Sequence, residues 1–125
     1  KKKSIKSLIL PVSAPFHCSL MKKAEENMKS KITDAVLKKP NPGIISNVTA
    51  KMENDPAIIK ELLIKQITST VRWRESLQYM INNGIDQFIE IGPGKVLSGL
   101  VKRTNRKIKI SNLNSLEDIN NYKNK

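Results

Sequence analysis

The sequence predicts an α/β fold, a layered sheet whose neighbouring strands are mainly parallel. Short apolar runs alternate with segments whose apolar residues recur every three or four positions, in the order β-α-β-α-α-β-α-β. This order favours strands joined by helical crossovers. The chain has 125 residues, the length of one domain, and its 38% hydrophobic and 27% charged residues are typical of a folded protein.

Two helices are expected in the first half of the chain. From Ser19 onwards every fourth residue is apolar, which predicts an amphipathic helix over residues 19–36 that ends before the Pro- and Gly-rich residues 40–43. These apolar residues are Leu20, Ala24, Met28, Ile32 and Val36. Asp55 followed by Pro56 is a helix-start signal, and it predicts a second helix to about Ile67.

The strands and the remaining helices are predicted from apolar runs and turn residues. Residues 7–12 (SLILPV) and 44–48 (IISNV) are short apolar runs typical of strands. In the second half, the expected elements are a helix over 73–83 closed by Gly84, a strand over 87–91, a helix over 96–101 and a strand over 107–111.

Composition narrows the possible functions. The net charge of +12 indicates a strongly positive surface, yet only four of the 23 basic residues are Arg and aromatic residues make up 4%, so nucleic-acid binding is disfavoured. One Cys and one His cannot form a disulfide framework or a zinc site. The apolar runs are far shorter than the ~20 residues that span a membrane. The chain begins with three Lys and shows no secretory signal, so no membrane association or export is expected.

His17 is a candidate catalytic residue because it lies where a predicted strand gives way to a helix. Catalytic groups gather at the carboxyl edge of strands in α/β sheets, and a neutral imidazole there accepts a proton near pH 7. A half-buried loop histidine is the alternative. Cys18 is discounted as a nucleophile paired with His17, because adjacent side chains do not readily point at each other.

The segment from Gly92 to Lys95 (GPGK) has two interpretations. Its turn between a strand and a helix offers backbone N–H groups that could bind an anion, but Ile89 and Val96 stand where a phosphate loop needs Gly and Ser or Thr. A corner that only reverses the chain is the alternative. No Gly-x-Ser-x-Gly nucleophile elbow occurs in the sequence.

Four blocks of this sequence closely resemble the malonyl-CoA:acyl carrier protein transacylase family, in its free-standing bacterial form. They occur in the same order as in that family, between residues 8 and 106, without an obvious gap. The blocks are LPVSAPFHCSLM (10–21), IISNVTA (44–50), KQITSTVRWRESLQYMINNG (65–84) and FIEIGPGKVLSGLVKR (88–103).

The resemblance implies the C-terminal part of an α/β-hydrolase-like acyltransferase core, with the edge of a ferredoxin-like small subdomain at the N-terminus. Residues 1–12 would be the end of the small subdomain and the return strand, residues 13–112 the core, and residues 113–125 a loosely held polar tail. The family is cytoplasmic, serves fatty acid biosynthesis and needs no cofactor or metal. Its substrates are malonyl-CoA and the phosphopantetheinylated acyl carrier protein.

The resemblance also implies residue roles. A serine takes the malonyl group from CoA and passes it to the carrier-protein thiol in a ping-pong reaction. His17 matches the catalytic histidine, and Gln66 matches the position whose backbone carbonyl orients that histidine. Because the carrier protein is acidic, Lys102 and Arg103 are the expected docking residues.

In this family the serine elbow, the oxyanion-hole donors and the malonyl-binding arginine precede the segment that resembles this chain. We therefore expect the chain to be catalytically silent alone and to need an N-terminal part of the same enzyme as a partner. One alternative is a non-catalytic remnant, or half of a split enzyme, that binds the acidic carrier protein. A basic nucleic-acid-binding module is a further alternative, supported only by the charge.

Overall fold

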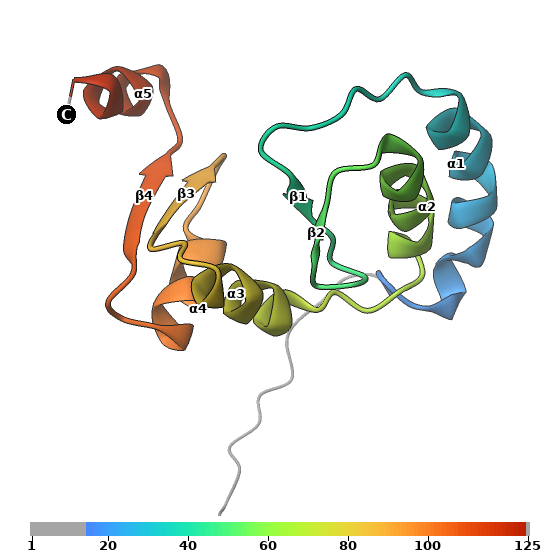
Figure 1. Ribbon diagram of the computed structural model, residues 1–125, viewed down its shortest axis with the longest axis horizontal. Helices are drawn as coiled ribbons and strands as arrows, with labels where there is room; N and C mark the ends of the chain where they lie inside the picture. The colour runs from blue at the N-terminus through green and yellow to red at the C-terminus, as the bar shows by residue number, and fades with distance from the viewer. Residues whose placement is uncertain (1–14, 125) are drawn as a thin grey trace, which may run out of the picture. The chain divides into compact units, whose positions relative to one another are not determined.

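The computed structural model describes residues 15–124, which form two compact units (Figure 1). The first unit comprises residues 15–44 and 53–71, and the second comprises residues 45–52 and 72–124. The described residues contain two separate two-stranded sheets. The mixed α/β class is therefore confirmed, whereas the prediction of one layered sheet is wrong for this part of the chain.

The first unit is built on the helix α1 (Lys22–Asp34), which follows a short 3-10 helix, η1 (Ser19–Met21). The predicted helix over residues 19–36 is confirmed, except that it ends slightly early. Ala35 has extended backbone angles (φ −61°, ψ 136°) and begins the connection towards the Pro-rich segment.

Helix α2 (Pro56–Gln66) packs beside α1, and its predicted start is confirmed (Figure 1). One carboxylate oxygen of Asp55 accepts hydrogen bonds from the backbone N–H of Ala57 at 2.7 Å and of Ile58 at 3.4 Å. Pro56 occupies the first helical position, where a missing N–H costs nothing. The Lys60 ammonium donates to the Thr33 carbonyl at 2.5 Å, which ties α2 to the last turn of α1.

The predicted strand over residues 44–48 is much shorter in the structure, and the one over residues 7–12 lies outside the described residues. Strand β1 (Ile44–Ile45) pairs with β2 (Met52–Glu53). The chain then turns, because the Ser46 hydroxyl accepts from the backbone N–H of Val48 at 3.1 Å and the Ser46 carbonyl accepts from that of Ala50 at 2.8 Å. Local bonds of this kind compete with strand pairing.

The second unit contains a β-α-β element. Helix α3 (Trp73–Asn82) precedes strand β3 (Gln87–Ile91), helix α4 (Val96–Thr104) and strand β4 (Lys109–Leu113). The two strands are parallel, with Gln87 opposite Lys109 and Ile91 opposite Leu113, which confirms the predicted parallel pairing. Strand β4 begins two residues later than predicted.

A local turn explains the late start of β4. The side-chain carbonyl of Asn105 accepts from the backbone N–H of Lys107 at 2.9 Å, so the chain is still turning at that point.

The core of the second unit is small. Leu77 is fully buried, and Val101 and Ile108 are nearly so. Partly buried apolar side chains surround this cluster, namely Trp73, Met80, Ile81, Phe88 and Ile110. The buried cluster and these neighbours together come from α3, α4, the β3–β4 sheet and the residue just before β4, so the two helices cover one face of that sheet.

The segment after Leu113, predicted to be a loosely held polar tail, instead contains helix α5 (Leu116–Lys123). The Ser115 hydroxyl accepts from the backbone N–H of Asp118, and the Asp118 carboxylate accepts from the backbone N–H of Asn114 and Ser115. These bonds lower the pKa of the Asp118 carboxyl, the Asn114 N–H most of all. The Ser-x-x-Asp spacing is the sequence signal that could have predicted this helix.

Candidate functional site

The structure brings His17 and Gln66 together in the first unit. The Nδ1 atom of His17 lies 2.9 Å from the backbone carbonyl oxygen of Gln66, across 49 positions of sequence. A carbonyl oxygen only accepts hydrogen bonds, so Nδ1 carries the hydrogen and donates it. The Nε2 atom is then the proton acceptor of the neutral ring. His17 is exposed to solvent.

The Gln66 side chain competes for the same ring nitrogen. Its amide Nε2 atom lies 3.3 Å from His17 Nδ1, and two donors cannot share one hydrogen bond. The contact between Nδ1 and the Gln66 backbone carbonyl is shorter, and in it only Nδ1 can be the donor. The main chain at residue 66, rather than the glutamine side chain, therefore fixes the tautomer of His17.

Helix α2 supplies a carbonyl that is free to accept. Gln66 is the last residue of α2, and the last carbonyls of a helix have no partner within that helix. In the described residues, the following backbone N–H groups of Ile67, Thr68 and Ser69 bond to Ile64 and Lys65 instead. The Gln66 carbonyl is left for the imidazole.

The backbone of His17 is unusual. Its φ angle is +56°, a left-handed conformation that costs a residue with a Cβ atom ~1–3 kcal/mol. Such conformations persist where the surrounding structure enforces them, and they cluster at functional sites. The left-handed turn directs the chain from the loop into η1 while the ring meets the end of α2.

A second contact, which the sequence did not predict, holds the segment just after α2 against α1. The Thr68 hydroxyl donates to the Glu25 carboxylate at 2.5 Å, and the Lys22 ammonium pairs with the other carboxylate oxygen. These hydrogen bonds, from Lys22 first and then from Thr68, lower the pKa of the Glu25 carboxyl. Thr68 lies two residues beyond Gln66, so this contact fixes the end of α2 against the helix that follows His17.

Cys18 takes no part in the arrangement. Its thiol donates to the Pro15 carbonyl at 3.2 Å, within its own loop.

The Gly92–Pro93–Gly94 turn reverses the chain between β3 and α4 in the second unit. Gly92 and Gly94 have φ angles of +121° and +93°, values that residues with side chains rarely adopt. Two N–H groups in the first turn of α4 are already bonded, because the Glu90 carboxylate accepts from Leu97 at 3.1 Å and from Ser98 at 2.8 Å. The structure therefore favours the chain-reversal interpretation of this motif.

Glu90 is also the centre of a polar network between β3, α4 and β4. Its carboxylate accepts from the Ser98 hydroxyl at 2.5 Å and from the Asn112 amide at 3.0 Å. The Asn112 amide also donates to the Ser98 hydroxyl at 2.7 Å. The Ser98 hydroxyl, followed by the Ser98 backbone N–H, lowers the pKa of the Glu90 carboxyl. This network anchors the start of α4 on the sheet.

Lys102 and Arg103 lie in the last turns of α4 and are exposed. Together with Arg106, they line an open hollow of about 520 Å³. Three cationic side chains around one hollow would attract an acidic protein surface or a bound anion.

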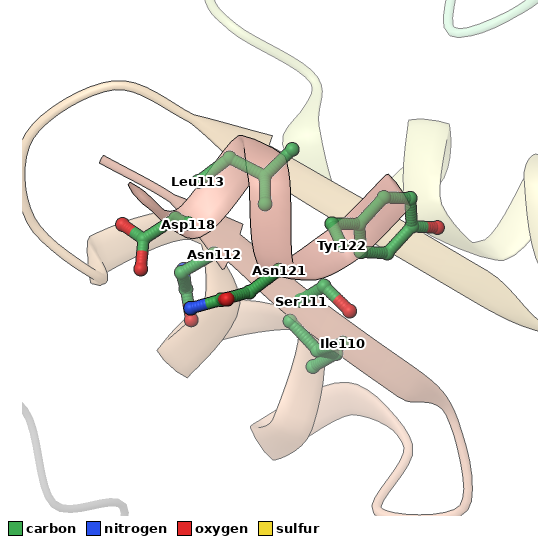
Figure 2. A pocket seen from close by; sticks show the side chains of 7 residues that line it. All are labelled: Ile110, Ser111, Asn112, Leu113, Asp118, Asn121 and Tyr122. Atoms are coloured by element: carbon green, nitrogen blue, oxygen red, sulfur yellow. The ribbon is translucent and has the colours of Figure 1, made fainter. Parts of the chain in front are cut away.

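A second hollow, of about 340 Å³, lies between β4 and α5 (Figure 2). Its lining is mainly polar and includes Ser111, Asn121 and the ring of Tyr122. The Tyr122 hydroxyl accepts from the Gln87 amide at 3.0 Å, which holds one end of α5 near the start of β3.

The described residues give no sign of a metal centre or a membrane segment. Residues 15–124 contain no group of three or more His, Cys, Asp or Glu side chains arranged to hold a metal ion. Every helix within the same residues is too short or too polar to cross a bilayer.

The chain is similar to known malonyl transacylases in sequence and structure, although no family model matches it. It is 43% identical over 113 residues to the malonyl CoA-acyl carrier protein transacylase of Staphylococcus aureus (strain COL), covering 90% of this chain and 37% of that protein. The crystal structure of acyl-carrier-protein-S-malonyltransferase from Bartonella henselae matches with a TM-score of 0.83 and 42% identity, covering 90% of this chain and 36% of that one.

A third match is a complex of a type II PKS acyl-carrier protein with its malonyl-transacylase, with a TM-score of 0.80 and 32% identity over 93% of this chain and 38% of that one. This chain thus spans somewhat more than a third of the proteins that it matches. High identity over nearly the whole chain, in sequence and in structure, is evidence of common descent. The chain is homologous to malonyl-CoA:acyl carrier protein transacylases, over a segment of those enzymes.

Proposed function

We propose that this chain supplies the histidine side of a malonyl transfer site. The observation that carries the proposal is the 2.9 Å hydrogen bond from His17 Nδ1 to the Gln66 carbonyl, in a chain homologous to malonyl transacylases. This hydrogen bond fixes the tautomer of the exposed imidazole ring and leaves Nε2 as its proton acceptor.

In the proposed reaction His17 moves one proton in each half. Nε2 accepts the proton of a serine hydroxyl as the serine oxygen bonds to the malonyl carbonyl carbon. It then gives that proton to the CoA sulfur as the carbon–sulfur bond breaks. In the second half the phosphopantetheine thiol gives its proton to Nε2 and takes the malonyl group, and the proton returns to the serine oxygen.

A neutral carbonyl suits this role better than a carboxylate. An ordinary triad orients its histidine with Asp or Glu, whose charge would repel an anionic malonyl group nearby. The Gln66 carbonyl orients the ring with no net charge, and its oxygen accepts from Nδ1 whether or not Nε2 is protonated.

The serine is not in this sequence, which contains no Gly-x-Ser-x-Gly. We infer that it comes from a polypeptide homologous to the part of the transacylases outside the matched segment. In that assembled enzyme, this chain would be the C-terminal part of an α/β-hydrolase-like core next to a ferredoxin-like subdomain, and the enzyme would act in the cytoplasm in fatty acid biosynthesis.

The acyl carrier protein is the proposed macromolecular partner. One homologue forms a complex with such a protein. Carrier proteins are acidic, and Lys102, Arg103 and Arg106 surround an open hollow on a chain with a net charge of +12. This cationic hollow is the proposed docking site.

The absence of a Gly-x-Ser-x-Gly elbow from the sequence favours one alternative. The chain would then be a non-catalytic remnant that binds the acidic carrier protein but assembles into no active enzyme.

A hybrid enzyme tests whether the chain supports malonyl transfer or is a non-catalytic remnant. In this hybrid, the chain replaces the matched segment of the Staphylococcus aureus relative, and malonyl transfer from malonyl-CoA to a holo carrier protein is measured. We expect transfer, and we expect His17→Ala to lower its rate by ~10² or more, as loss of a general base does. Lys23→Ala, a change on the exposed surface of α1, is the matched control. A folded hybrid without transfer, or one indifferent to His17→Ala, would contradict the proposal.

A further inference from the structure

The two stretches of chain that meet at His17 and Gln66 also meet at a second point. Glu25 lies in α1, the helix that follows His17, and Thr68 lies two residues beyond Gln66. The Thr68 hydroxyl donates to the Glu25 carboxylate at 2.5 Å, across 43 positions of sequence. The same two stretches are therefore joined twice, once by the imidazole and once by this hydroxyl.

The bond between the imidazole and the Gln66 carbonyl is open to water. His17 is exposed, so water competes for the Nδ1 hydrogen, and a single exposed hydrogen bond contributes little net stability. The left-handed φ angle of +56° at His17 adds strain that the surrounding structure must hold. A released neutral ring can carry its hydrogen on either nitrogen. A fixed tautomer therefore needs a carbonyl that something other than the ring keeps in place.

The turn after α2 couples Thr68 to the Gln66 carbonyl. The backbone N–H groups of Thr68 and Ser69 both donate to the Lys65 carbonyl, at 3.2 Å and 3.0 Å. These bonds wrap the chain tightly around Gln66. A displacement of Thr68 would therefore also displace the carbonyl that accepts from the ring.

Glu25 is held so that its carboxylate meets Thr68. One carboxylate oxygen pairs with the Lys22 ammonium, and the other accepts from the Thr68 hydroxyl. The Glu25 side chain is 15% exposed, and these hydrogen bonds, from Lys22 first, lower the pKa of its carboxyl. The carboxylate is therefore charged at neutral pH and acts only as an acceptor. The Thr68 hydroxyl has one hydrogen, and the Glu25 oxygen is much closer than the Lys65 carbonyl, which lies 3.5 Å away.

We propose that Thr68 and Glu25 are positioning residues for His17. Their hydrogen bond holds the Gln66 carbonyl against the imidazole and thereby keeps the hydrogen of the neutral ring on Nδ1. The consequence for malonyl transfer rests on the proposed function, whereas the consequence for the tautomer does not. Misplacement of a reacting group by ~1 Å can cost ~10²-fold in rate, so a small movement at the end of α2 would matter.

Another tie between the same helices separates positioning from packing alone. The Lys60 ammonium donates to the Thr33 carbonyl at 2.5 Å, in the last turn of α1 and so at the end of that helix away from His17. Lys60→Met removes this tie without changing the turn after α2. If Thr68 and Glu25 only packed the two helices together, loss of either tie would have the same effect on the ring.

Nitrogen NMR reads the tautomer of His17 without an enzyme assay. His17 is the one histidine of the sequence, so isotopically labelled histidine gives one Nδ1 signal and one Nε2 signal. At about pH 8, where a neutral imidazole predominates, we expect a protonated Nδ1 and an unprotonated Nε2 in the parent chain. Thr68→Val should move both signals towards the average of the two tautomers. Thr68→Ser should restore the parent signals, and Lys60→Met should leave them unchanged.

Three results of this experiment would overturn the inference. Mixed tautomers in the parent chain would mean that its own residues do not hold the ring. Parent signals in Thr68→Val would mean that the hydroxyl is not needed, and an equal shift in Lys60→Met would mean that any loss of packing releases the ring. Circular dichroism checks that each variant is folded. Glu25→Ala removes the acceptor and places a strong helix former in α1, so it gives the same test if Thr68→Val unfolds.

Malonyl transfer by the hybrid enzyme measures the catalytic consequence. Thr68→Val and Glu25→Ala should each lower kcat ~10-fold and leave the KM for malonyl-CoA within ~2-fold, because only the base is displaced. The double variant should lose no more than either single variant, since both remove the same hydrogen bond. Lys60→Met should keep the parent kcat. An active hybrid whose kcat is unaffected by Thr68→Val and Glu25→Ala refutes this inference alone. An inactive parent hybrid refutes the proposed function alone, because the tautomer still decides the inference.

Discussion

The backbone carbonyl of Gln66 accepts a hydrogen bond from the imidazole of His17, two residues that lie 49 positions apart in sequence. The acceptor is the last carbonyl of α2, and the donor ring belongs to a residue in a left-handed conformation just before η1. The orientation of the histidine therefore depends on where one helix ends rather than on a side chain that accepts from the ring.

The first prediction concerns the glutamine side chain. Gln66→Ala keeps the backbone carbonyl, so the kcat of the hybrid enzyme should change by less than about threefold, whereas His17→Ala should lower it ~10²-fold. Steady-state malonyl transfer measures both. A loss for Gln66→Ala as large as that for His17→Ala would mean that the side chain, and not the main chain, holds the ring.

The second prediction concerns the start of α2, whose other end holds His17. Asp55→Ala removes the carboxylate that accepts from two backbone N–H groups, and loss of such a cap costs ~0.5–2 kcal/mol of unfolding free energy. Urea unfolding of the chain, followed by circular dichroism, measures the loss. Glu61→Ala, at an exposed residue within α2, is the control and should change stability by less than ~0.5 kcal/mol. Equal effects of the two variants would exclude a capping role.

Local signals predicted helices α1 to α4 and strand β3 well, whereas the Ser-x-x-Asp signal of α5 was overlooked. Asp55–Pro56 marked the start of α2, and Gly84, with a φ angle of +86°, follows α3 as expected from its lack of a side chain. The alternation of QFIEI marked β3. Each signal lies within a few residues of the feature that it predicts, so no knowledge of the tertiary structure was needed.

Contacts between distant residues could not be predicted from these patterns. The bond between Thr68 and Glu25 spans 43 positions, and Glu90 meets Asn112 across 22. Neither pair has a characteristic spacing. The pairing of His17 with Gln66 was expected only from the family resemblance, since no periodicity indicates it. The length of β1 was overestimated because Ser46 forms local bonds that end the strand.

The third prediction concerns the core of the second unit. Leu77 has no exposed surface and packs against Val101 and Ile108, so Leu77→Ala should cost ~2–5 kcal/mol of unfolding free energy. Leu116→Ala removes the same atoms from a side chain that is 79% exposed and should cost less than ~0.5 kcal/mol. Denaturant unfolding of both variants measures the contrast. Similar losses at the two positions would show that the cluster around Leu77 is not the core.

The fourth prediction is a pH dependence at Glu90. Its pKa is lowered from the ordinary 4.5 by hydrogen bonds, first of all from Ser98, so the folded state binds a proton less readily than the unfolded state. The resulting stability is fully present above pH 4.5 and is lost as the pH falls through the lower, folded-state pKa. Unfolding midpoints measured between pH 7 and pH 3 should fall more steeply for the parent chain than for Glu90→Gln. Parallel curves would mean that the network adds no pH-dependent stability.

The fifth prediction concerns the cationic hollow on α4. Lys102→Glu and Arg103→Glu place negative charge where an acidic carrier protein is proposed to dock, so each should raise the KM of the hybrid for the carrier protein ~3–10-fold. The KM for malonyl-CoA and the kcat should stay unchanged, because these side chains are proposed to contact only the carrier protein. Added salt should shrink the difference in KM between each variant and the parent hybrid, since exposed charges are screened over ~8 Å at physiological ionic strength.

Lys123→Glu makes the same change of charge on the exposed surface of α5 and is the control. If it raises the KM equally, the net charge of the chain attracts the carrier protein, and α4 is not a specific docking site.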